Sequence, residues 1–357
     1  MFTVLNIIIL FSVLIIGGLG WENYYFLGSI LLWLIINFFI SVRQKKDFKF
    51  PPGVFLYQIF LIFFSFNLFW TKNFWSTLLY LMFYAIGFFF WIIAYNQKPK
   101  FKHLAGLVIL LGVIFAIWSI VNILIGIEPK IDSFSLNKFA TRDHHHIADL
   151  WAVVLSIIAV NLMTGSKNKI YWLLIPFGAY LFYISRSRTA ILALLAGTFY
   201  IFQALPETKK YLKRLYILIT AAILLFLFFG RTKPVLLDRV YYLQGIAGVI
   251  RNPLGVGVGN FGLISSDSKN HLFGLSDFSS VAMNLILEML TGMGVFAFIF
   301  LVWFIKVIFT VFAHHDENSL VPKLIFLTLT VNFLFDFTYL IPTFLWLWFI
   351  SLGLSQK

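Results

Sequence analysis

Long apolar runs recur along the whole chain with only short polar breaks, and this pattern constrains the fold more than any other feature. The chain has 357 residues, of which 61% are hydrophobic and 11% are charged, whereas a soluble domain is about 25% charged. In lipid, backbone N–H and C=O groups must be satisfied within the spanning structure, so runs of this kind favour transmembrane helices. We predict an all-α integral membrane protein with a single polytopic domain over residues 1–357.

About twelve membrane spans account for the apolar runs. The first run has no basic segment before it and no Ala-x-Ala cleavage site, so we expect it to be retained as a membrane helix. The chain contains no cysteine, which excludes disulfides and thiolate metal sites. The predicted spans are residues 3–18, 24–42, 53–70, 75–95, 104–125, 147–163, 170–184, 188–205, 215–230, 279–305, 323–338 and 341–355.

The lysines orient these spans. With the N-terminus inside, the cytoplasmic loops hold most of the basic charge, and both termini are predicted to be cytoplasmic. The formal net charge of +13 is therefore assigned to membrane insertion and anionic lipid, and not to nucleic acid. The basic residues of the predicted inner loops are Arg43, Lys45, Lys46, Lys49, Lys98, Lys100, Lys102, Lys167, Lys169, Lys209, Lys210, Lys213 and Arg214.

Arginines are distributed differently, because most of them fall on the predicted outer side. Two of them stand at the mouth of a predicted helix, in the run Ser185-Arg186-Ser187-Arg188-Thr189-Ala190. A guanidinium group stays charged and matches phosphate oxygens in a bidentate manner, so this placement indicates a phosphate-bearing ligand. The alternative is that these arginine side chains extend to the membrane interface (snorkelling) or pair with nearby acidic residues. The outer arginines are Arg142, Arg186, Arg188, Arg231, Arg239 and Arg251.

The longest polar break, residues 231–278, is predicted to be an extracytoplasmic loop with a surface helix. Apolar residues at helical spacing from Val235 to Ile250 predict that helix, with Arg239 on or near its inner face. After Arg251, glycines alternate in the run Gly255-Val256-Gly257-Val258-Gly259. Such a run can expose backbone N–H groups as an anion-binding nest. No buried strand precedes it, so it is not a dinucleotide fingerprint.

These segments together resemble the O-antigen ligase and polysaccharide polymerase superfamily of bacterial envelopes. The resemblance rests on Ser187-Arg188-Thr189-Ala190, on Arg239 followed by Asn252-Pro253-Leu254-Gly255-Val256-Gly257, and on the helix that opens at Asn284. It is strongest over residues 185–300. It implies a C-type glycosyltransferase-like fold with a long outer loop between helices 9 and 10, in the bacterial cytoplasmic membrane, with the active site on the outer face.

The resemblance also implies a chemistry without metal or other cofactor. The donor is a glycan on undecaprenyl diphosphate, the acceptor is a glycan or a lipid, and Arg188 and Arg239 hold the diphosphate. Membrane lipids and envelope-assembly proteins are the remaining expected partners. Met283 occupies the place of the family's histidine, beside Asn284. Methionine does not accept a proton at neutral pH, so the base has to lie elsewhere.

Candidate bases are His271, Asp277, Glu288 and the run His144-His145-His146. Glu288 attracts most interest, because an ionisable group in an apolar span is a functional hypothesis by default; pairing with a lysine or arginine is the alternative. We assign Arg188, Arg239 and Glu288 to catalysis. We assign the following residues to substrate binding: Arg186, Arg251, His146, His271, Asn284, Gly255 and Gly257.

The run of three histidines raises the question of a metal site, and the class of protein also stays open. Neighbouring residues on a helix point about 100° apart, so the three consecutive histidines are not expected to bind one metal ion by themselves. The missing histidine favours a polymerase over a ligase. A transporter or lipid flippase is the rival class, although internal repeats, its usual mark, are not evident in the sequence. A non-catalytic membrane partner of an envelope assembly is a third reading.

Overall fold

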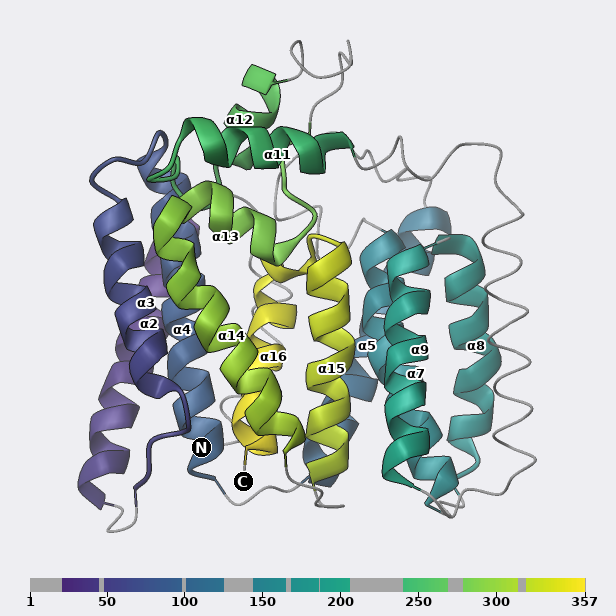
Figure 1. The fold of residues 1–357 in the computed structure, drawn as a ribbon. Coiled ribbons are helices and arrows are strands. Elements are labelled where there is room, and N and C mark those ends of the chain that lie inside the picture. Colours follow the sequence, from purple (N-terminus) through teal and green to yellow (C-terminus); the bar gives the residue numbers. More distant parts are fainter. Residues whose placement is uncertain are drawn as a thin grey trace.

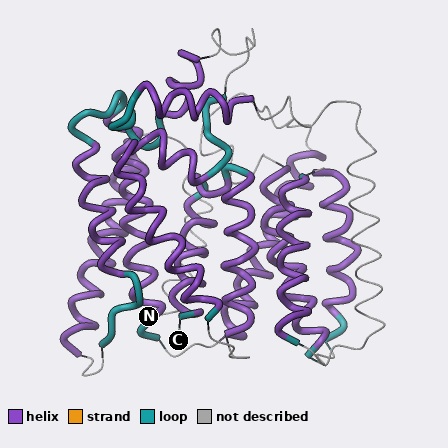
Figure 2. Tube along the Cα trace, viewed as in Figure 1, coloured by secondary structure: helices purple, strands orange, loops and turns teal. Residues whose placement is uncertain are grey.

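The computed structural model describes residues 21–44, 48–97, 101–124, 144–164, 168–185, 187–205, 240–268, 279–313 and 319–356, and all regular structure in these ranges is helical (Figures 1 and 2). The prediction of an all-α protein is confirmed for this part of the chain. The α-helices are α2 (Trp21–Gln44), α3 (Val54–Asn67), α4 (Phe74–Tyr95), α5 (Phe101–Leu124), α7 (His144–Met163), α8 (Ile170–Ser185), α9 (Arg188–Ala204), α11 (Val240–Arg251), α12 (Phe261–Ser268), α13 (Leu285–Met293), α14 (Ala297–Phe312), α15 (Leu320–Phe335) and α16 (Pro342–Ser355).

Four stretches of helix are long and apolar enough to cross a membrane, judged by length and composition. They are Tyr24–Gln44, Phe74–Tyr95, His146–Met163 and Leu285–Phe312, and shorter apolar helices pack beside them. Each predicted span that falls on described residues coincides with a helix. The predicted spans 3–18 and 215–230 lie outside the described residues. The described part of the chain is therefore all-helical, and its apolar helices indicate a membrane-embedded protein.

One predicted span has different limits in the structure. The span expected at 279–305 begins at Leu285, where Asn284 caps the helix, and runs through α13, the 3-10 turn η2 (Gly294–Phe296) and α14 to Phe312. Gly294 has a positive φ of 57°, a conformation that glycine adopts without steric cost. The helix bends at this point without ending.

Glycines allow the closest helix packing, between α4 and α16. A Cβ on Gly87 would overlap the ring of Phe349, and a Cβ on Gly353 would overlap the backbone oxygen of Trp91. In a membrane, small residues at helix contacts let the backbones approach and maximise dispersion contacts. Buried aromatic side chains surround this contact, and Trp303 lies against both Trp91 and Phe349.

The connections alternate between the two ends of the bundle. We call the end that carries α11 and α12 the loop end; it also carries the connections at residues 68–73, 185–188 and 336–341 (Figure 1). The connections at 48–53 and 168–169, with Lys49 and Lys169, lie at the opposite end (Figure 1). The lysine pattern predicts that the loop end faces outward.

The predicted helix of the long loop is present in the described residues. It was expected over 235–250, of which 235–239 lie outside the described residues, and it is observed as α11, Val240–Arg251, followed by α12, which the sequence did not predict. Gln244, Gly245 and Gly248 form its buried face, while Leu243, Ile246 and Ile250 are exposed. Glycines face the protein because α12 and α13 approach closely: a Cβ on Gly245 would lie 2.9 Å from the side chain of Leu287.

Candidate functional site

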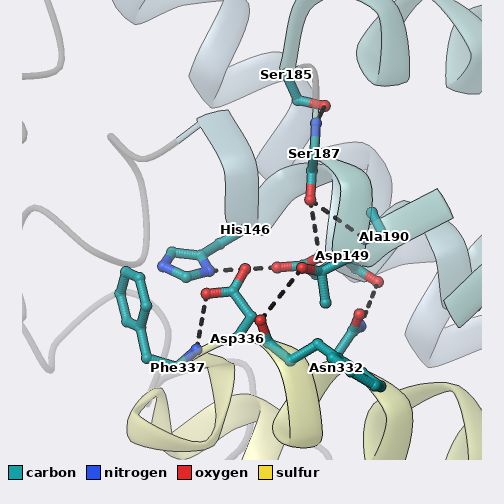
Figure 3. A network of polar contacts seen from close by, with 10 residues as sticks. His146, Asp149, Ser185, Ser187, Ala190, Asn332, Asp336 and Phe337 are labelled. Atoms are coloured by element: carbon teal, nitrogen blue, oxygen red, sulfur yellow. Dashed lines mark hydrogen bonds and ion pairs between the residues drawn. The ribbon is translucent and has the colours of Figure 1, made fainter. Parts of the chain in front are cut away.

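Buried polar side chains from three helices meet at the loop end (Figure 3). His146 and Asp149 lie one turn apart on α7, with His146 Nδ1 3.4 Å from Asp149 Oδ2. Their side chains are 4% and 0% exposed. A carboxylate and an imidazole this deeply buried require polar partners, since an uncompensated charge in the interior is costly.

Ser187 connects this pair to the first turn of α9. Its hydroxyl oxygen accepts a hydrogen bond from Ala190 N–H at 3.2 Å, as an N-cap, and the hydroxyl donates to Asp149 Oδ1 at 3.4 Å. The helices approach because the seam between them is built from alanine: Ala148, Ala152, Ala190 and Ala193 form a small buried cluster. Ser187 thus fixes the start of α9, where Arg188 stands, against α7.

The end of α15 supplies the third side of the cluster. Asn332 Nδ2 donates to the backbone oxygen of Asp149 at 3.4 Å, and Asp336 Oδ1 accepts from Phe337 N–H at 2.7 Å. The ring of Phe337 meets the His146 imidazole edge-on, with centroids 4.7 Å apart. One ligand-type atom from each of His146, Asp149 and Asp336 lies within 4.8 Å of the others.

The predicted arginines are only partly placed. Arg188 is the first residue of α9 and is half-buried, directly after Ser187. Arg251 is exposed in the last turn of α11. Arg186, Arg239 and His271 lie outside the described residues, so the shared diphosphate site of Arg188 and Arg239 stays a prediction.

Sequence reasoning found His146 and Arg188 but missed how the cluster is built. The spacing His146-x-x-Asp149 is a usable signal, because residues three apart on a helix lie on one face. No sequence pattern predicts that Asp336 lies beside His146 and Asp149, because α7 and α15 are far apart in the sequence and meet only through tertiary packing.

The glycine segment after α11 does not form the expected anion-binding nest. Gly255, Gly257 and Gly259 have positive φ angles of 77°, 97° and 86°, yet their N–H groups are donated within the fold. Gly255 N–H donates to Asn252 O at 2.8 Å and Gly257 N–H to Gly292 O at 2.8 Å. The assignment of Gly255 and Gly257 to substrate binding through these groups is therefore corrected: they dock the outer loop onto α13.

The same segment is bound from its other side by the α3–α4 connection. Trp70 Nε1 donates to Leu254 O at 2.9 Å, and Thr77 Oγ1 donates to Val258 O at 3.0 Å. A Cβ on Gly257 would overlap Thr71 Oγ1. The glycines are required because backbone lies against backbone and hydroxyl here, which leaves no volume for a side chain.

Glu288 belongs to this docking and is not placed as a general base. Its side chain is 1% exposed; Oε1 accepts from Gly259 N–H at 2.8 Å and Oε2 from the Tyr339 hydroxyl at 3.3 Å. Burial raises the pKa of Tyr339, in the turn between α15 and α16, well above its ordinary value, and the Glu288 charge raises it further, so the hydroxyl stays a donor.

Asn284 is likewise used by the fold. Its Oδ1 accepts from Leu287 N–H at 2.9 Å as the N-cap of α13, and its Nδ2 donates to Leu334 O at 2.6 Å. The expected substrate contact is corrected to a cap that joins α13 to α15. The preceding Met283 has a positive φ of 47° and its carbonyl accepts from the Tyr242 hydroxyl at 3.1 Å. This strained residue closes the loop against α11.

Comparisons with known proteins give no family for this chain: no family model, no curated protein and no solved structure matches it. The fold and the site by themselves define an all-helical, membrane-embedded protein with a buried His–Asp–Ser cluster at one end of the bundle. At that end, Arg188 opens a helix beside the cluster, and a glycine-docked loop carries Arg251.

Proposed function

We propose that this protein is a membrane glycosyltransferase that transfers or polymerises a glycan linked to undecaprenyl diphosphate on the outer face of the bacterial cytoplasmic membrane. The observation that carries the proposal is the position of Arg188. It opens α9 at the loop end, half-buried, next to a serine that is hydrogen-bonded to buried Asp149. A charged side chain fixed at the end of an apolar bundle favours an anionic, lipid-linked ligand.

The reaction needs little beyond positioned charge. An acceptor hydroxyl attacks the anomeric carbon of the donor, the bond from that carbon to the diphosphate oxygen breaks, and the diphosphate leaves with the bonding electrons. The hydroxyl proton passes to a base or to water. Fixed guanidinium groups stabilise the charge that develops on the leaving group, and loss of one such donor typically costs about 10²–10³ in rate.

The assignment of roles differs from the sequence interpretation at four residues: Gly255, Gly257 and Asn284 are used by the fold, and Glu288 changes role as well. Arg188 keeps the role of a diphosphate ligand, with Arg239 as its proposed partner. Glu288 no longer has a catalytic role, because its oxygens accept hydrogen bonds from the docked loop and from Tyr339. Met283 in the place of the family's histidine favours a polymerase, which joins repeat units, over a ligase, which transfers a finished chain.

The test is analysis of lipid-linked glycans in a strain that lacks the gene and is complemented with variants. We expect Arg188→Ala and Arg239→Ala to abolish polymer and to accumulate single repeat units, with normal amounts of protein in the membrane. Arg188→Lys keeps the charge but loses the bidentate fork, so it should restore only part of the activity. Accumulation of long lipid-linked chains would indicate a ligase.

Arg43→Ala is the matched control, because it removes the same charge from the last turn of α2, at the opposite end of the bundle. It should support wild-type polymer. Retention of polymer in both the Arg188 and Arg239 variants would refute the proposed function.

A further inference from the structure

We propose that His146, Asp149 and Asp336 bind one divalent cation at the loop end of the bundle. The three side chains come from α7 and from the turn that follows α15 (Figure 3). Two are buried and Asp336 is half-buried, so the cluster reaches the protein surface at Asp336. Imidazole nitrogen and carboxylate oxygen are both common metal ligands.

The spacing of the ligand atoms fits one coordination sphere. One atom from each residue lies within 4.8 Å of the others. Metal–ligand bonds of about 2.1–2.4 Å separate opposite ligands by roughly 4.2–4.8 Å, so one ion can reach all three atoms with small side-chain adjustments. His146 and Asp149 share one face of α7, and such pairs three residues apart also carry the ions of helical carboxylate proteins.

Asn332 provides a second, independent observation. Its side chain is 0% exposed, and its Oδ1 has no hydrogen-bond partner among the described residues. It stands one turn before Asp336, and its Nδ2 contacts the backbone oxygen of Asp149 at 3.4 Å. A buried carbonyl oxygen without a donor is destabilising, because no hydrogen bond compensates its loss of contact with water. This unsatisfied oxygen belongs to an amide that stands beside the Asp149 backbone, at the edge of the cluster.

The donor set indicates which cations fit best. Carboxylates alone favour Mg²⁺ and Ca²⁺, whereas an added imidazole shifts the preference toward Mn²⁺ or Zn²⁺. The three consecutive histidines do not supply this site by themselves. His146 alone enters the proposed set, and the other two ligands are Asp149, one turn further along α7, and Asp336, in the turn after α15. The sequence reading expected no metal because it considered the run without these aspartates.

Binding of the ion does not rest on the proposed transfer reaction. An ion at this position would hold α7 to the end of α15 and place positive charge near the first turn of α9, where Ser187 is bonded to Asp149. The resemblance implies a transfer reaction without a metal, so we assign the ion to the architecture of this end and derive no catalytic step from it.

The experiment uses the full-length protein in detergent, stripped with a chelator and titrated with Mn²⁺. Calorimetry should give one saturable site, and pulsed EPR should show a directly coordinated histidine nitrogen. Asp336→Asn and His146→Gln should each weaken binding at least tenfold, because each removes a ligand. Zn²⁺ should displace the bound Mn²⁺.

Asp267→Asn is the control, since it removes an exposed carboxylate of α12 at the same end of the bundle. Its affinity should stay within about twofold of wild type. Absence of a stoichiometric site in the wild type, or equal binding by the Asp336 and Asp267 variants, would overturn the proposal. If a ligand variant does not fold, the nitrogen signal of the wild type decides: its absence at saturation overturns the site.

Discussion

Replacing Glu288 tests whether this residue anchors the outer loop or acts as a catalytic base. Glu288→Ala removes the acceptor of Gly259 N–H at 2.8 Å and of the Tyr339 hydroxyl at 3.3 Å. The first bond is short and charge-assisted, worth about 1.5–3 kcal/mol, and the second is long, worth about 0.5–1.5 kcal/mol. Removal of the buried carboxylate returns part of its desolvation cost. We expect a net loss of about 2–4 kcal/mol in the free energy of unfolding.

The assay is thermal unfolding in detergent, followed by tryptophan fluorescence. At about 2 °C per kcal/mol for a chain of this size, Tm should fall by roughly 4–8 °C. Hydrogen exchange of the amides at residues 254–260 should accelerate, because these amides belong to the segment that Glu288 docks. Glu288→Gln keeps one acceptor oxygen and should lose less than half as much.

Asp267→Ala serves as the control for loss of an acidic side chain. Asp267 is exposed and lies 3.8 Å from Lys72, and an exposed pair of this kind contributes about 0–1 kcal/mol. The reasoning fails if Glu288→Ala unfolds within 1 °C of the Asp267 control by the same assay. Such a result, combined with loss of glycan polymer, would return Glu288 to the list of candidate bases.

Two further substitutions test the docked loop and the helix cap. Gly257→Ala should destabilise the protein by at least about 2 kcal/mol, because its φ of 97° disfavours a side chain and its Cβ would overlap Thr71 Oγ1. Gly106→Ala is the control, because a Cβ there meets nothing within 4 Å. In the same thermal unfolding assay it should be neutral or stabilising. Asn284→Ala should lower the free energy of unfolding by about 1–3 kcal/mol, and by more than Asn73→Ala does. Both residues cap a helix, but only the Asn284 side chain also bonds α15. Equal Tm values for the two variants would contradict this prediction.

Much of the helical framework could be predicted from the sequence, because hydropathy depends on local composition. Apolar runs placed α4, α7 and α16 to within a few residues, since lipid requires every span to satisfy its own backbone. The limits of α13 were wrong by several residues. There the helix start is set by the Asn284 side chain, which also bonds the backbone of α15, and hydropathy carries no information on that contact.

The candidate site was less predictable, because its polar groups serve two different purposes. Chemical identity alone made Glu288 and the alternate glycines suggestive of catalysis and anion binding. In the structure, their hydrogen-bonding groups satisfy each other: Glu288 accepts from Gly259, and Gly257 donates to Gly292. A long polar loop that lies on apolar helices must satisfy its backbone internally, and this requirement competes with function for the same residue types.

The polar cluster around His146 and Asp149 lies on the other side of the loop end from the docked glycine segment (Figures 1 and 3). The side-chain atoms of Asn284 and Glu288 already form hydrogen bonds within the fold, so these atoms are not available to bind a ligand. At the α7–α9–α15 junction, side chains also pair with one another: Ser187 with Asp149, and His146 with Asp149. The full burial of the Asp149 side chain in this junction calls for a reason. Orientation of Arg188 and binding of a cation are the two reasons proposed here, and the glycan and metal-binding experiments test them separately.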